Sequence, residues 1–205
     1  MADELTAWGF EFRAEGIKKA HPSPIESAFL KGHSVINLLQ IGAPPEIAAR
    51  LPKGQIIRIK LEIDTDPPPS ATTEMLTRLV PTPHAVRVYA LPSLFAGKLH
   101  AVLCRNWKHR VKGRDFYDLV WYVGRRVPLN LAHLEARMRQ SGDWPLETPL
   151  DAPRLRKCLE ERFASIRFDQ AKEDVAPFLK DPRELSLWSE GFFMDLIPLV
   201  QTGKG

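Results

Sequence analysis

The stretch IRIKLEIDTDPPP, residues 57–69, decides the first half of the fold. Within it aliphatic and charged residues alternate: the aliphatic ones are Ile57, Ile59, Leu61 and Ile63, and the charged ones are Arg58, Lys60, Glu62 and Asp64. Side chains two apart on a β-strand share a face, so the pattern predicts a strand over 55–64 with one apolar and one charged face. The prolines that follow lack backbone donors and end the strand. An extended path to Asp66 would bring a third carboxylate to the strand end.

Composition sets the frame around this strand. The 205 residues are 44% hydrophobic, enough for a substantial core in one or two domains. The net charge of +4 permits a phosphate-bearing partner without requiring one. Cys104 and Cys158 form no zinc-binding motif, which predicts reduced thiols and a cytoplasmic location. No signal peptide or long apolar run is present, so we expect no membrane association.

The remaining pattern places strands first and helices afterwards. Further strands are predicted at 26–31 and 84–89, and a short helix at 34–41. The helices expected later in the chain cover 92–107, 114–125, 130–140, 152–165, 169–179 and 182–200. This order predicts an α+β protein with a small mixed sheet in a domain of residues 1–90 and a helical domain of residues 91–205.

The charged strand face has two interpretations. Its side chains could form cross-strand ion pairs, each worth only about 0.2–1 kcal/mol. Alternatively, Glu62 and Asp64 could bind a divalent metal, because Mg²⁺ prefers oxygen ligands and usually retains substrate phosphates in its shell. Both interpretations remain open at this point.

Lys98 interrupts an apolar stripe on the predicted helix that begins near Pro92. It lies four residues after Leu94 and four before Val102, both apolar. A lysine in such a stripe is costly unless its ammonium reaches water or meets an anion. Lys98 therefore either extends to solvent at the rim of the stripe or reaches a phosphate in a cleft.

A basic segment separates this helix from the next. Five of the ten residues 105–114 are Arg or Lys, with a tryptophan and a histidine among them. Such a segment is either a solvated loop or a site for a nucleic-acid backbone with aromatic stacking. The candidate RNA-binding residues are Arg105, Trp107, Lys108, Arg110 and Lys112. The aromatic residues of 116–122 are more simply explained as core.

Three motifs in order give the chain a family resemblance. They are IKLEID (59–64), YALPSLFAGKLHAVLCR (89–105) and KGRDFYDL (112–119). Together they resemble the AbiEii/AbiGii family of nucleotidyltransferase toxins, which belong to type IV toxin–antitoxin and abortive-infection systems. The resemblance covers most of the chain and is strongest over 56–125. It implies a DNA-polymerase-β-like nucleotidyltransferase core followed by a helical C-terminal domain.

The resemblance also implies an activity and partners. Members of this family are expected to move a nucleotide from an NTP to an RNA acceptor, tRNA above all, with Mg²⁺ or Mn²⁺, and to work with a cognate antitoxin. By position, Lys60 and Glu62 match the second motif, and Lys98 matches the lysine expected to hold triphosphate. Arg114 and Asp118 match the arginine and the final acid of the fourth motif. The implied sites are therefore Lys98 and Asp118 for catalysis, Lys60, Lys98 and Arg114 for the nucleotide, and Glu62 and Asp64 for the metal.

One departure from the family limits this expectation. The family's first motif is a glycine turn followed by a D-x-D pair, and residues 1–55 contain no match to it. We therefore expect a partial nucleotidyltransferase domain, truncated at its N-terminus and inactive as this 205-residue polypeptide. The alternative function is a catalytically dead module that binds RNA or the antitoxin.

Overall fold

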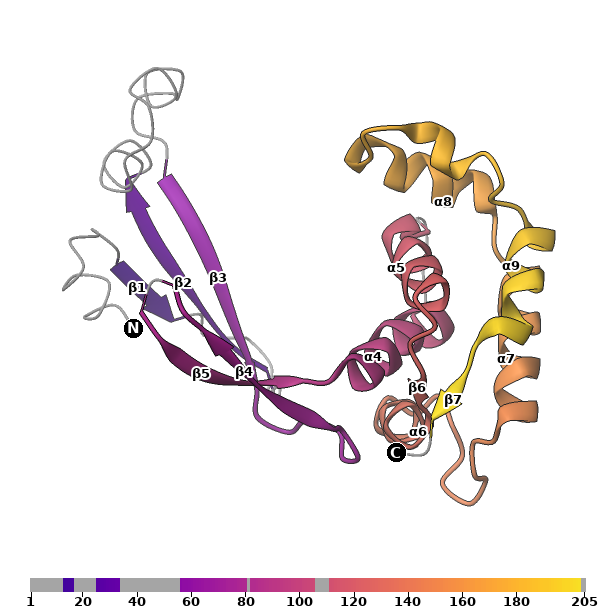
Figure 1. Cartoon of the computed structure of the whole chain (residues 1–205), viewed down its shortest axis with the longest axis horizontal. Helices are drawn as coiled ribbons and strands as arrows, with labels where there is room; N and C mark the ends of the chain where they lie inside the picture. Colours follow the sequence, from indigo (N-terminus) through magenta and orange to yellow (C-terminus); the bar gives the residue numbers. More distant parts are fainter. Residues whose placement is uncertain (1–12, 17–24, 34–55, 81, 106–110, 204–205) are drawn as a thin grey trace. The chain divides into compact units, whose positions relative to one another are not determined.

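The computed structural model describes most of the chain, and by contacts the chain divides into two compact units, Met1–Pro67 and Pro68–Gly205 (Figure 1). The described residues are 13–16, 25–33, 56–80, 82–105 and 111–203. The predicted domain boundary between residues 90 and 91 stays a prediction, while the division by contacts falls between Pro67 and Pro68.

The first unit contains an antiparallel sheet with the strand order β1–β2–β3. Its strands are β1 (Arg13–Gly16), β2 (Ile25–His33) and β3 (Ile56–Asp64). β2 is the central strand, because it pairs with both β1 and β3. Its register against β3 pairs Ser27 with Glu62 and Phe29 with Lys60. The predicted strands at 26–31 and 55–64 are confirmed, whereas β1 was not predicted. The predicted helix at 34–41 lies outside the described residues.

The second unit begins with a β-hairpin. Its strands, β4 (Thr73–Arg78) and β5 (His84–Tyr89), pair antiparallel. The sequence predicted β5 but not β4. Side chains along β4 are exposed except for the half-buried Leu76, so β4 carries no strong hydrophobic alternation. Backbone pairing with β5 explains the strand instead.

Six α-helices in the described part follow this hairpin (Figure 1). They are α4 (Leu91–Cys104), α5 (Gly113–Gly124), α6 (Leu131–Gln140), α7 (Ala152–Ala164), α8 (Phe168–Val175) and α9 (Glu190–Leu196). Asp151 caps α7, accepting a hydrogen bond from the backbone N–H of Arg154 at 2.9 Å. Together with the small sheets, these helices confirm the α+β class.

Two predicted helices differ from the structure in extent. The helix predicted to reach residue 107 ends at Cys104, because Arg105 is already extended. The single helix predicted over 182–200 is wrong. That segment contains the 3₁₀ helices η2 (Pro182–Leu185) and η3 (Ile197–Leu199), with α9 between them. Ser189 explains the break: its hydroxyl accepts from the backbone N–H of Phe192 at 3.2 Å and so starts a new helix.

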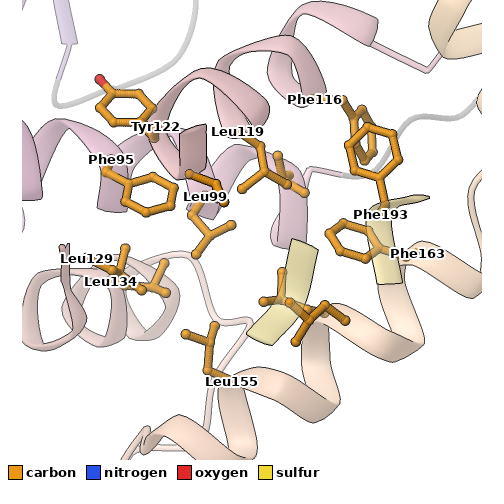
Figure 2. Packing of buried hydrophobic residues seen from close by; sticks show 14 of the residues in the cluster. Phe95, Leu99, Phe116, Leu119, Tyr122, Leu129, Leu134, Leu155, Phe163 and Phe193 are labelled. Carbon is orange, nitrogen blue, oxygen red and sulfur yellow. The ribbon is translucent and has the colours of Figure 1, made fainter. Parts of the chain in front are cut away.

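The core of the second unit is rich in aromatic side chains (Figure 2). Phe95 of α4 stacks on Tyr122 of α5, with ring centroids 4.9 Å apart. Phe116 meets Phe193 edge-to-face at 5.4 Å, which joins α5 to α9. The prediction that the aromatic residues of 116–122 are core is confirmed for Phe116 and Tyr122. It is wrong for Trp121, which is exposed and lies beneath the guanidinium of Arg125.

A buried polar group attaches the proline-rich segment to the helices of the second unit. Asn130 donates to the backbone carbonyl of Ser70 at 2.8 Å, and its side-chain oxygen caps α6. Nδ1 of His133 donates a hydrogen bond to the backbone carbonyl oxygen of Pro69 at 2.8 Å. These contacts fix the chain just before β4.

Among the described residues, no helix is long and apolar enough to cross a membrane.

Candidate functional site

Lys98 and Asp118 face each other across the packed helices α4 and α5. Their ammonium and carboxylate groups are 2.7 Å apart, and the side chains are 49% and 34% exposed. The ammonium of Lys98 both pairs with a carboxylate and reaches water. These two contacts offset the desolvation energy of a lysine in the apolar stripe. The structure confirms that Lys98 and Asp118 come together. It places Glu62 in the other unit, so the expected sharing of this site with Glu62 stays a prediction.

A second ion pair lies deeper at the same helix junction. Arg105, just after α4, donates to the carboxylate of Asp115 in the first turn of α5 at 2.6 Å. Asp115 is only 8% exposed. Burial raises the pKa of the Asp115 carboxyl, although the positive charges of Arg105 and Lys112 act in the opposite direction. Asp115 is thus an acid that the fold buries against a cation.

These two pairs line one cleft of about 470 Å³. Its cations are Lys98, Arg105, Lys112 and Arg114, its carboxylates are Asp115 and Asp118, and its other lining residues are Tyr117, Val175, Phe178 and Leu179. Cations therefore outnumber carboxylates in the lining by four to two. A cleft with this balance attracts anions, and the phosphates of a nucleotide are anions of suitable size.

Arg114 takes a different position from the one a simple helix pair would give. It lies one turn before Asp118, but Asp118 pairs with Lys98. The guanidinium of Arg114 lies over the ring of Phe178, 4.9 Å from its centroid. This cation–π contact holds Arg114 at the cleft, where its planar donor group suits phosphate recognition.

Gly113 explains how α5 can start so close to α8. A Cβ atom on Gly113 would lie 1.9 Å from the carbonyl oxygen of Ala171, a contact that no side chain could tolerate. The backbone N–H of Gly113 donates to Asp174 at 3.0 Å. The glycine in KGRDFYDL therefore allows α8 and the following turn to supply the far wall of the cleft.

The sequence reasoning missed part of this lining. The sequence predictions did not include Asp115, Val175, Phe178 or Leu179. A signal for Asp115 was present, because it precedes the buried Leu119 by four residues and Tyr122 by seven. That spacing puts Asp115 on the buried face of α5. No local signal identified the residues from α8 and η1 (Ala176–Phe178), which depend on tertiary packing.

The other predicted site residues are distributed as follows. On β3, Lys60 and Glu62 form an ion pair of 2.6 Å, with both side chains about half exposed. Asp64 is exposed, and its carboxylate accepts the backbone N–H of Asp66 at 3.1 Å. Of the predicted RNA-binding residues, Arg105 and Lys112 lie at the cleft. Trp107, Lys108 and Arg110 lie outside the described residues.

Comparison with known protein families identifies the family of the chain. The chain belongs to the AbiEii family, because the model described as nucleotidyl transferase AbiEii toxin, type IV TA system, matches residues 1–193. Searches of curated proteins and of solved structures gave no significant match. The protein is thus a nucleotidyltransferase-like toxin of a type IV toxin–antitoxin system, a class that implies an antitoxin partner and generally a divalent metal.

Proposed function

We propose that the protein transfers a nucleotide from an NTP to an RNA acceptor, with tRNA as the expected acceptor, and that the α4–α5 cleft holds the triphosphate. The observation that carries this proposal is the gathering of three further cations, Arg105, Lys112 and Arg114, around the Lys98–Asp118 pair in one cleft. Phosphoryl transfer depends mainly on positioning and charge neutralisation, which lysine and arginine supply.

Within this proposal each cleft residue has a role. Lys98 and Arg114 bind the phosphates, the first as a compact charge and the second as a planar donor. Asp118 holds the Lys98 ammonium at 2.7 Å and so directs it into the cleft. The acceptor hydroxyl loses its proton to the solvent as its oxygen bonds to the α-phosphorus, and pyrophosphate leaves with the electrons of the broken P–O bond.

The metal ligands proposed for this family chemistry are Glu62 and Asp64, with Lys60 as a nucleotide contact beside them. The two acids follow each other at the spacing that shares one strand face, and both are exposed. Their oxygen donors suit Mg²⁺ or Mn²⁺, which would neutralise phosphate charge when bound. Lys60 competes for Glu62 through their 2.6 Å ion pair. Two acids on one strand bind Mg²⁺ weakly on their own, because its octahedron needs further ligands.

The transfer assay uses labelled NTPs, Mg²⁺ and total tRNA with two polypeptides. One is the 205-residue chain, and the other is extended to an upstream D-x-D pair if the gene encodes one in frame. We expect RNA labelling by the extended form, lost on Lys98→Ala, and none by the 205-residue form. Strong labelling by the 205-residue form, lost on Lys98→Ala, would support transfer and refute the expected inactivity.

A second candidate, a module that binds RNA or antitoxin without catalysis, has its own support. Three of the candidate carboxylates are already in ion pairs: Asp118 with Lys98 and Asp115 with Arg105 in the cleft, and Glu62 with Lys60 on β3. Paired acids favour a structural role, while Lys112 and Arg114 keep the surface basic. This candidate replaces the first if neither polypeptide labels RNA although both bind it.

RNA binding itself gives a testable prediction. Neutralising Lys108, Arg110 and Lys112 together by alanine should weaken binding to all RNA sequences alike. It should also reduce the slope of log affinity against log salt by about 0.7 for each lost phosphate contact. The measurement is an RNA titration at several salt concentrations. Unchanged affinity and slope would show that these three cations do not contact RNA.

A further inference from the structure

A cluster of potential metal ligands lies apart from the Lys98–Asp118 pair, where α4 ends beside the turn after α6. His100 and Cys104 are four residues apart on α4 and so project from one face of the helix. Asp143 comes from the turn that follows α6. One donor atom from each of the three lies within 4.8 Å of the other two. His100 and Cys104 lie within the motif of residues 89–105, but neither they nor Asp143 has a role in the proposed transfer reaction.

We propose that His100, Cys104 and Asp143 form a binding site for Zn²⁺ or a similar borderline-soft cation, which joins the end of α4 to the turn after α6. The donors are an imidazole nitrogen, a thiolate sulfur and a carboxylate oxygen. This set suits Zn²⁺, whereas Mg²⁺ prefers oxygen ligands alone. Three protein ligands leave one tetrahedral position for water.

The distances are compatible with this assignment after a small adjustment. Zinc–ligand bonds of about 2.0–2.3 Å place tetrahedral donors roughly 3.5 Å apart. Donors within 4.8 Å must therefore approach one another by about 1 Å. Asp143 is exposed and His100 half-buried, so side-chain rotation can bring them together.

Ser141 contacts two of the three proposed ligands. Its hydroxyl lies 3.0 Å from Nε2 of His100 and donates to Asp143 at 2.5 Å. The hydroxyl thus connects two of the three proposed ligands. A bound cation would take over this connection, and Ser141 would turn to the backbone carbonyl of Met138, 3.1 Å away.

Charge balance requires the thiolate form of Cys104. The positive charge of Arg137 acts on His100, and that of Arg162 acts on Cys104. Both charges disfavour the binding of a cation at these ligands. Arg162 is held in place by the carbonyl oxygens of Val102 and Arg105. A thiolate and a carboxylate together offset the two charges of Zn²⁺. Binding therefore displaces the Cys104 proton to the solvent as the sulfur–metal bond forms.

The test is a Co²⁺ titration of the full chain after removal of metal with a chelator, followed by competition with Zn²⁺. We expect one equivalent of Co²⁺ to produce a sulfur-to-cobalt charge-transfer band and tetrahedral d–d absorption. Cys104→Ser should abolish the charge-transfer band and weaken Zn²⁺ binding at least about tenfold. Cys158→Ser is the matched control, because Cys158 lies on α7 and is not among the three ligands, and it should retain the band.

Two further variants keep the test decisive if Cys104→Ser folds poorly. Asp143→Asn changes an exposed turn residue and should weaken Zn²⁺ binding, whereas Ser141→Ala should leave it unchanged or tighten it. Zn²⁺ should also protect Cys104, the remaining thiol of the Cys158→Ser protein, from alkylation. Absence of the band in the unmodified chain, or its loss in Cys158→Ser, would overturn the three-ligand assignment. These readouts require no nucleotide transfer, so they are independent of the proposed function.

Discussion

The charged face of β3 and the α4–α5 cleft contain the same kinds of side chain in different environments. On β3 the Lys60–Glu62 pair is half exposed, and the apolar residues Ile59 and Ile63 beside it are 43% and 63% exposed. In the cleft Asp115 is nearly buried against Arg105, and the helices around it rest on a closed aromatic core. Charges positioned by a core are fixed by the fold, whereas charges on an exposed strand depend on what they bind.

The largest loss of stability is expected from a substitution that disturbs the backbone packing at the cleft. Gly113→Ala should destabilise the second unit by about 1–3 kcal/mol or more, because the new Cβ would collide with the carbonyl of Ala171. Gly124→Ala is the matched control at the other end of α5, where no atom lies within 4 Å of the added Cβ. Chemical denaturation of both variants measures the difference. Equal stability of the two variants would show that α5 does not approach α8 so closely.

The buried pair should produce the next largest effect. Asp115→Asn alters the buried side chain that accepts a hydrogen bond from Arg105, and it should cost about 1–3 kcal/mol at acid pH, below the unfolded pKa of Asp115. The folded pKa of Asp115 is raised, so its contribution to stability is full below its unfolded pKa and declines as the pH rises through the folded pKa. The stability gap between the natural chain and Asp115→Asn should therefore narrow over that pH interval. Denaturation curves from acid to neutral pH measure this stability difference. If the difference widened with rising pH, the charge of Arg105 would lower the pKa of Asp115 by more than burial raises it.

The smallest effect is expected on the strand. Lys60→Ala and Glu62→Ala should each change stability by less than about 1 kcal/mol, because an exposed ion pair contributes little. A double-mutant cycle by denaturation measures the coupling. If the coupling were as large as that of Arg105 with Asp115, the contrast between the two regions would disappear.

The sequence predicted the elements that periodicity controls and missed those that packing controls. Alternation from Ile57 to Ile63 was sufficient for β3, and the stripe around Lys98 was sufficient for α4. The strand β4 lacks an apolar face, so its pairing with β5 had no signal in its own residues. The break before α9 came from the Ser189 cap, which competed successfully with a long helical pattern.

The candidate site divides in the same way. Motif order placed Lys98, Arg114 and Asp118 together, and the structure brings all three to one cleft. Burial of Asp115 and the wall formed by Phe178 depend on contacts between helices distant in sequence. The ligand cluster at Cys104 was missed because Asp143 lies 39 residues further along the chain, outside any short zinc motif.

Equilibrium binding of NTP to the 205-residue chain tests the central claim, that the α4–α5 cleft holds a triphosphate. We predict saturable binding in the presence of Mg²⁺ that weakens at least about tenfold, or ~1.4 kcal/mol, in Lys98→Ala. Lys157→Ala is the control, because Lys157 is also a helical lysine near a carboxylate but lies on α7, outside the cleft. Equal NTP affinity in Lys98→Ala, Lys157→Ala and the natural chain would contradict the claim.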